Sequence, residues 1–232
     1  MINLLHISDL HIHCHKADNA IVMDKLNKIQ ETYPEDQLII TGDITDDGHP
    51  YQYDNAKDIP GLKVPGNHDF GAAGNFYSHK KAVLFDLIFN TNFAGDNEPE
   101  IEIIDGVRFI GIDSNLETEH PFDFACGEVG SKQLKMLKGI LNGPSMPTVV
   151  YMHHHPFMHH DPFMMLKDAK EFIRIVYGRI DVLLFGHRHM ESIWENYCGI
   201  KLIHSAGRFD LMDKTLRITI DNGVVSGNYV DI

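Results

Sequence analysis

Short apolar runs alternate along the chain with segments of helical periodicity, and this alternation constrains the fold more than any other feature of the sequence. Most runs are four to six residues long and rich in Ile, Val and Leu, as buried β-strands are. Asp105-Gly106 and Asn222-Gly223 stand between such runs and predict tight hairpin turns. The expected strands are Ile2–Ile7, Gln37–Thr41, Leu62–Pro65, Ile101–Ile104, Val107–Ile112, Thr148–Met152, Asp181–Phe185, Ile193–Tyr197, Ile200–His204 and Thr215–Ile220.

Four segments have the apolar spacing of helices that pack one face on a core. They are Asp18–Glu31, Tyr77–Phe89, Ser131–Leu141 and Pro162–Tyr177. Strand–helix–strand alternation is expected to dominate the first 90 residues, and hairpins the rest. The pattern predicts a layered α/β protein with mixed sheets and helices packed outside. A length of 232 residues favours a single domain over 1–232.

The charge balance and the cysteines limit the partners and the compartment that we expect. With 20 Lys+Arg against 33 Asp+Glu, the net charge of −13 works against nucleic-acid binding, which needs clustered Lys and Arg. No apolar run approaches the roughly 18 residues that span a bilayer, so no membrane partner is expected. Residues 1–6 lack the features of a signal peptide. The three cysteines show no C-x-x-C spacing, which argues against a disulfide framework. We therefore expect a cytoplasmic protein.

The chain contains 16 histidines, and histidine is the commonest metal ligand in proteins. Five of the strand-like runs end abruptly in residues that can bind metals. Because ligand sites of α/β folds lie beyond the carboxyl ends of strands, these five segments are expected to surround one point. The segments are Ser8-Asp9-Leu10-His11, Gly42-Asp43, Gly66-Asn67-His68-Asp69, His153-His154-His155-Pro156 and Gly186-His187-Arg188-His189.

Each segment carries a different weight when it is taken alone. A D-x-H match or an i, i+2 histidine pair often arises by chance, whereas Gly66-Asn67-His68-Asp69 is much rarer. All five segments in this order, each after an apolar run, indicate a shared metal site. A set of nitrogen and oxygen ligands without a thiolate suits Mn, Fe, Zn, Co or Ni rather than calcium.

The series of segments resembles the calcineurin-like metallophosphoesterase superfamily, whose motifs read D-x-H, G-D-x-x-D, G-N-H-D/E, H and G-H-x-H. The matching motifs span residues 9 to 189. The stretch Ile39–Gly48 and the H-H-H-P segment look most like the branch of cyclic-nucleotide and glycerophosphodiester phosphodiesterases. The resemblance implies a four-layer α/β/β/α sandwich of two mixed sheets with outer helices, and a two-metal site between the sheets.

The same resemblance assigns ligands to two transition metal ions, with Mn, Fe or Zn foremost. It places Asp9, His11 and His189 on the first metal, Asn67, His187 and a histidine of the 153–155 run on the second, and Asp43 between both. His153 comes first after the apolar run and is the preferred ligand of its segment. An H-x-P interpretation of the same segment would favour His154.

His68 adjoins Asn67 without being a ligand in the family, and is the candidate general acid. Asp46 occupies the last position of G-D-x-x-D and could orient the His68 imidazole. Asp69 is the competing partner of His68, and ordinary turn chemistry before Gly48 is the alternative explanation of Asp46.

The activity implied by the resemblance is hydrolysis of a small phosphodiester, in which a hydroxide that bridges the two cations attacks phosphorus and His68 protonates the leaving group. A phosphomonoesterase or a nuclease on the same scaffold, and a non-catalytic metal-binding scaffold, are the alternatives. The negative charge weakens the nuclease alternative. The resemblance also allows for a homodimer, although no segment identifies an interface.

Overall fold

The computed structural model describes residues 1–71, 77–118, 123, 125–157 and 161–232, and two β-sheets form its centre. The strands are β1 (Ile2–Ile7), β2 (Gln37–Thr41), β3 (Leu62–Val64), β4 (Glu100–Ile104), β5 (Val107–Gly111), β6 (Thr148–Tyr151), β7 (Val182–Phe185), β8 (Ser192–Tyr197), β9 (Ile200–Ser205), β10 (Lys214–Asp221) and β11 (Val224–Asp231). One sheet has the order β11-β10-β1-β2-β3 and the other β4-β5-β6-β7-β9-β8.

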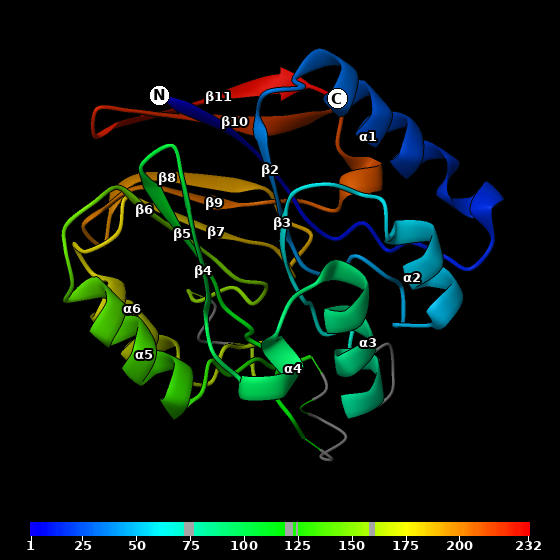
Figure 1. Ribbon diagram of the computed structural model, residues 1–232, viewed down its shortest axis with the longest axis horizontal. Coiled ribbons are helices and arrows are strands. Elements are labelled where there is room, and N and C mark those ends of the chain that lie inside the picture. Colours follow the sequence, from blue (N-terminus) through cyan, green and yellow to red (C-terminus); the bar gives the residue numbers. More distant parts are fainter. Residues whose placement is uncertain (72–76, 119–122, 124, 158–160) are drawn as a thin grey trace.

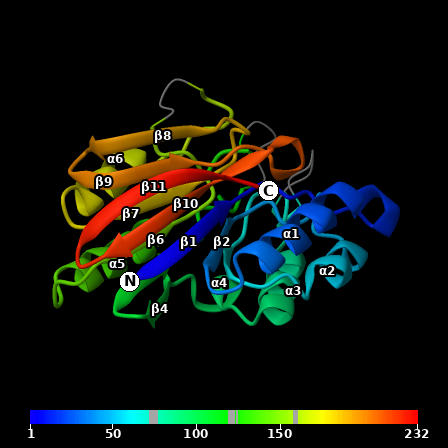
Figure 2. The same cartoon turned by 90° about the horizontal axis from the view of Figure 1, so that it is seen from above.

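Helices cover the outer faces of both sheets. The described helices are α1 (Ala20–Thr32), α2 (Pro50–Ala56), α3 (His79–Phe89), α4 (Phe93–Asp96), α5 (Ser131–Leu141) and α6 (Ala169–Val176), with 3₁₀ turns at Lys16–Asn19 and Phe209–Leu211. Figure 1 shows α5 and α6 on one side of the paired sheets and α1, α2 and α3 on the other. The turned view of Figure 2 shows the strands of the two sheets running in stacked layers. The expected α/β sandwich of two mixed sheets with outer helices is confirmed.

The strands β5, β6 and β7 of the larger sheet are buried on both faces, which explains their continuous apolar sequences. In β6, Val149 and Tyr151 face the other sheet, whereas Val150 packs under α5 and α6. In β7, Leu184 faces the other sheet and Leu183 the helices. The period of two therefore separates two apolar clusters, one between the sheets and one beneath the outer helices.

Both predicted hairpin turns are present. β4 pairs with β5 and β10 with β11 in antiparallel fashion. Asp105, Gly106, Asn222 and Gly223 all have positive φ, between 47° and 80°, as two-residue turns of this kind require. Between the hairpins, however, β5, β6, β7 and β9 are parallel, so the second half of the chain is less dominated by hairpins than its sequence suggested.

Three helices differ most from the expectation, whereas α1 and α3 begin only two residues later than expected. α6 begins at Ala169 rather than Pro162, because the Asp168 carboxylate accepts hydrogen bonds from the backbone N–H groups of Val129 and Gly130 and fixes the preceding turns. The short helices α2 and α4 lack an apolar stripe long enough to predict. The strand β11 was also missed, since it is an edge strand with few buried residues.

The parallel strands bring their carboxyl ends to a common edge. β1, β2 and β3 are parallel neighbours in one sheet, and β5, β6, β7 and β9 in the other. The loops that follow these strands therefore meet where the two sheets face each other. Among the described residues, no helix is long and apolar enough to cross a membrane.

Candidate functional site

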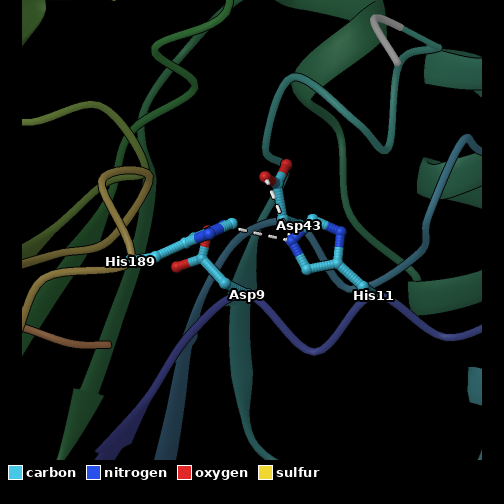
Figure 3. Close-up of side chains that lie close together, drawn as sticks. All are labelled: Asp9, His11, Asp43 and His189. Atoms are coloured by element: carbon cyan, nitrogen blue, oxygen red, sulfur yellow. Dashed lines mark hydrogen bonds and ion pairs between the residues drawn. The ribbon is translucent and has the colours of Figure 1, made fainter. Parts of the chain in front are cut away.

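The structure brings together seven of the side chains that the five segments singled out. They are Asp9 and His11 after β1, Asp43 after β2, Asn67 after β3, His153 after β6, and His187 and His189 after β7. Figure 3 shows four of them, Asp9, His11, Asp43 and His189, pointing toward one another from three separate loops. All seven are buried except His189, whose side chain is 40% exposed.

The first cluster consists of Asp9, His11, Asp43 and His189, whose nearest ligand atoms all lie within 4.8 Å of one another. His11 Nε2 lies 3.3 Å from His189 Nε2, and His189 Nε2 lies 3.3 Å from Asp9 Oδ1. Asp9 Oδ1 is buried and accepts no hydrogen bond within the described structure. Lone pairs that converge so closely on each other fit a shared cation, and the nitrogen and oxygen donors are those of a transition metal.

The second cluster is centred on His153. Its Nε2 lies 3.3 Å from Asp43 Oδ2, 3.1 Å from His187 Nδ1 and 3.1 Å from Asn67 Oδ1. The ligand atoms of Asp43, His153 and His187 again lie within 4.8 Å of one another. Four donors from four strand ends could thus hold a second cation.

Asp43 belongs to both clusters through a single oxygen atom. Asp43 Oδ2 lies 3.3 Å from His153 Nε2 and 4.0 Å from His11 Nε2. The other carboxylate oxygen, Oδ1, accepts a hydrogen bond of 2.9 Å from the backbone N–H of His68. The carboxylate is therefore fixed on one side by the backbone and presents its second oxygen to both clusters.

The charges of the second cluster balance one another in the metal-free protein. Burial by itself would raise the pKa of Asp43, but His153 and its neighbouring imidazoles hold that pKa well below its usual range. Burial would lower the pKa of His153, yet the carboxylates of Asp43 and Asp9 raise it to about 9. Burial and the charge of His153 lower the pKa of His187 to about 3. In the metal-free protein, the ionised Asp43 carboxylate therefore favours a positive charge on the His153 imidazole.

The backbone at the clusters is strained. Five of the seven residues have the left-handed conformation that L-residues avoid: Asp9 (φ 56°), His11 (φ 49°), Asp43 (φ 48°), His187 (φ 73°) and His189 (φ 52°). Each costs about 1–3 kcal/mol, and such residues gather at functional sites. Backbone hydrogen bonds between loops hold them, among them Asp9 N–H to Gly42 O and His11 N–H to Asp43 O, both 3.0 Å.

Two glycines permit the loops to approach each other. A Cβ atom on Gly66 would lie 2.2 Å from Asp43 Oδ1, and one on Gly186 would lie 1.9 Å from Ser8 Oγ. Neither distance can accommodate a side chain. The glycines of the G-N-H-D and G-H-x-H segments therefore serve the packing of the clusters.

His68 is half-buried beside the first cluster, and its ring stands edge-on to that of His11 at 4.7 Å between centroids. Its Nδ1 lies 2.7 Å from the backbone oxygen of Asp46. The Asp46 carboxylate faces elsewhere, with Oδ1 3.8 Å from His11 Nδ1 and Oδ2 3.5 Å from His13 Nδ1. Asp46 thus contacts His68 through the main chain and two other imidazoles through its side chain.

Asp69, the competing partner of His68, has its carboxylate buried between two loops. It accepts hydrogen bonds from the backbone N–H groups of Ile44, Thr45 and Gly66 and from the Thr45 hydroxyl, at 2.8–3.2 Å. Burial and the nearby Asp43 carboxylate raise the pKa of Asp69 to about 6. This carboxylate fastens the loop after β2 to the loop after β3.

The structure distinguishes His153 from its neighbour. His154 Nδ1 lies 2.9 Å from Ser114 Oγ, and that oxygen also accepts the His154 backbone N–H at 3.1 Å. His154 packs against the His187 ring, with 4.4 Å between centroids, but its nitrogens are not among the clustered ligand atoms. His153 occupies the position in the cluster.

Sequence reasoning missed a sixth strand end, Asp113-Ser114-Asn115 after β5. Asn115 donates its side-chain N–H to Pro65 O at 3.3 Å and to Asp113 Oδ1 at 2.8 Å, which links this segment to the loop that carries Asn67. The signal was present in the sequence, since these three polar residues follow the apolar run Val107–Ile112.

Comparisons with known proteins identify a family and several relatives. The sequence model of the family described as calcineurin-like phosphoesterase matches residues 2–191. A probable cyclic nucleotide phosphodiesterase of Synechococcus is 28% identical over 169 residues, which make up 68% of this chain and 59% of that protein. The glycerophosphodiester phosphodiesterase GpdQ of Enterobacter lignolyticus is 30% identical over 172 residues, 66% of this chain and 56% of that protein. The match thus spans less than two thirds of the length of these relatives.

Among solved structures, a dimetal phosphatase from Danio rerio superposes with a TM-score of 0.71 at 14% sequence identity. The superposition covers 97% of this chain and 95% of that one. At this identity the likeness concerns the fold.

Replacing Gly66 with alanine should disrupt the clusters. The added Cβ meets Asp43 Oδ1 and the Asp43 backbone nitrogen, so the Gly66→Ala variant should lose about 1–3 kcal/mol of unfolding free energy in urea. Gly139→Ala is the matched control, because Gly139 lies in α5 with open space around its Cα and alanine there should add up to about 1 kcal/mol. Equal shifts in the two variants would contradict the close approach seen at Gly66.

Asp113 should make the stability of the metal-free protein depend on pH. Burial, above all, raises the pKa of Asp113 to about 7, so between about pH 4 and pH 7 the unfolded chain releases a proton that the folded protein keeps. Stability should therefore fall as pH rises through this range, by at most about 1.4 kcal/mol per pH unit. The Asp113→Asn variant should lack this component. Urea unfolding at pH 5, 6, 7 and 8 measures it, and a constant difference between variant and wild type would refute it.

Proposed function

Because this chain belongs to the calcineurin-like phosphoesterase family, we propose that it is a phosphodiesterase with a dinuclear metal centre that acts on a small phosphodiester. The resemblance inferred from the motifs is confirmed, including its branch, since curated relatives are named for cyclic nucleotides and for glycerophosphodiesters. The proposal extends this family membership to a metal number, a set of ligands and a substrate class.

The position of Asp43 carries the proposal. One carboxylate oxygen that lies between His11 on one side and His153 on the other is suited to bridge two cations. We assign Asp9, His11 and His189 to the first cation, Asn67, His153 and His187 to the second, and Asp43 to both. Nitrogen and oxygen donors without a thiolate favour Mn, Fe or Zn.

Charge supports an anionic substrate at this place, although the chain as a whole carries −13. Among the assigned ligands, Asp9 and Asp43 carry the formal negative charge, and two divalent cations would outweigh it. When bound, such cations supply Lewis acidity toward the phosphoryl oxygens and lower the pKa of a coordinated water. The protein's part is to hold the ligands at the required spacing.

We assign His68 the role of general acid and Asp46 that of its positioning residue. A backbone carbonyl can only accept, so the contact with Asp46 O places a proton on His68 Nδ1 and leaves Nε2 as the nitrogen that exchanges a proton with the leaving oxygen. The Asp46 carboxylate faces His11 Nδ1, which favours an imidazole whose Nε2 points to the first cation.

The metal-loaded enzyme should hydrolyse a phosphodiester in preference to the monoester. We expect purified protein in Mn²⁺ to cleave bis(4-nitrophenyl) phosphate faster than 4-nitrophenyl phosphate, with two metal ions per chain by elemental analysis. Asp43→Asn should lower the rate at least about 100-fold, since loss of groups that merely support ligands already costs about 10–100-fold. Asp24→Asn, the same chemical change on the exposed face of α1, is the control.

Two results would overturn this proposal in different ways. Protein without bound metal and without activation by Mn²⁺ would indicate a non-catalytic scaffold. A strong preference for the monoester would replace the diesterase with a phosphomonoesterase on the same site.

The general acid can be tested with two leaving groups. Protonation by His68 matters most for a strongly basic alkoxide and least for nitrophenolate, which leaves readily without a proton. His68→Ala should therefore slow a methyl or glycerol diester by about 10²–10⁴-fold, and the nitrophenyl diester far less. Equal losses on both substrates would show that His68 acts in another way.

A further inference from the structure

A chain of polar side chains crosses the interior between the two sheets, behind the clusters. His6 on β1 and His204 on β9 are both buried, and their Nδ1 atoms lie 2.7 Å apart. At one end, His6 Nε2 lies 2.9 Å from the Thr41 hydroxyl oxygen. At the other end, His204 Nε2 lies 3.7 Å from Glu191 Oε1. Thr41, His6 and His204, from both sheets, thus form one hydrogen-bonded series, and the Glu191 carboxylate lies near its end.

The chemistry of the groups gives the series a direction. Glu191 Oε1 is too far from His204 Nε2 for a hydrogen bond, and Nε2 has no hydrogen-bond partner within the described structure, but the nearby carboxylate charge favours a proton on that nitrogen. A neutral His204 then accepts at Nδ1, and His6 must donate from its own Nδ1. The remaining His6 Nε2 accepts from the Thr41 hydroxyl. Burial and the neighbouring His204 lower the pKa of His6, and burial lowers that of His204, in agreement with one proton on each ring.

Folding alone does not call for such a series. Buried polar groups stabilise a fold only when they are fully hydrogen-bonded, and apolar side chains of similar volume often serve as well or better. Neighbours of both histidines on the same strands, such as Leu4, Leu5 and Leu202, are apolar and buried. The two imidazoles therefore call for another explanation.

The ends of the series touch the segments that carry the clusters. The backbone oxygen of Thr41 lies 2.7 Å from His153 Nδ1 and accepts the Ser8 hydroxyl at 3.0 Å. Thr41 is thus held through its hydroxyl by His6 and holds His153 through its carbonyl. Glu191 follows His189 by two residues, and His6 precedes Asp9 by three.

We propose that His6 and His204 are positioning residues that fix Thr41, and through it the His153 imidazole, for the second metal. This inference rests on the proposed dinuclear centre and adds residues that contact neither metal nor substrate. A carbonyl held in place keeps the proton of His153 on Nδ1, so that Nε2 stays directed at Asn67, His187 and Asp43.

Three variants of the full chain separate positioning from general stability. His6→Leu/His204→Leu removes both imidazoles together and leaves the buried Thr41 hydroxyl without its acceptor, so the urea midpoint should fall no further than in Leu202→Ala, while one of the two Mn²⁺ affinities falls about 10–100-fold. His204→Gln keeps an acceptor for His6 and a donor for Glu191, and should retain the affinity within about threefold. Leu202→Ala, on the same strand, should lower the urea midpoint and leave the affinity unchanged.

Titration with Mn²⁺ and ¹⁵N NMR of the histidine rings give the readouts. In metal-free wild type near neutral pH, the spectra should show His6 protonated at Nδ1 alone and His204 at Nε2 alone, whereas His153 should carry a proton on Nδ1 and a second one on Nε2 beside Asp43. The positioning role is overturned if the double leucine variant keeps the Mn²⁺ affinity of wild type. It is also overturned if His204→Gln or Leu202→Ala loses as much Mn²⁺ affinity as the double leucine variant does. Wild-type protein that binds no Mn²⁺ would instead refute the proposed function.

Discussion

The carboxylate of Asp43, enclosed between two sheets, is the constraint on which the site depends. A buried carboxylate is unfavourable unless charge and hydrogen bonds compensate it, and here one oxygen takes a backbone N–H while the other faces His11 and His153. Much of the surrounding structure follows from this arrangement. Gly66 must lack a side chain, and His153 must be aimed from behind by Thr41 O.

The backbone of the loops that surround the Asp43 carboxylate is strained. The left-handed residues of the clusters lie in the loops within four residues of the ends of β1, β2 and β7, so the sheets stay regular and these loops absorb the distortion. Asp69 joins two of these turns by accepting from three backbone N–H groups and a hydroxyl. Turns that are tied to one another in this way restrict the positions of their side chains. A pair of closely spaced cations would need ligands with such restricted positions.

Much of this architecture could be predicted from sequence, because strands buried on both faces give unbroken apolar runs and Asn-Gly and Asp-Gly mark hairpins. The preference for His153 over His154 agrees with the strand pattern, because the period of two that turns Val149 and Tyr151 toward the other sheet turns His153 the same way. Long-range contacts were not accessible. The partners of Asp168 that delay α6 lie 38 and 39 residues away, and the direction of the Asp46 side chain depends on the loop after β1.

The strand order sets the time at which the site can form during synthesis. β1 lies between β2 and β10, so one of the two neighbours of the strand that leads to Asp9 and His11 is made much later than the strand itself. The backbone oxygen of Asp9 also accepts from Phe209 N–H. At about 5–20 residues per second, the first strand waits roughly 10–40 seconds for this partner. The strand pairing that supports Asp9 and His11 is therefore completed only after β10 has been made.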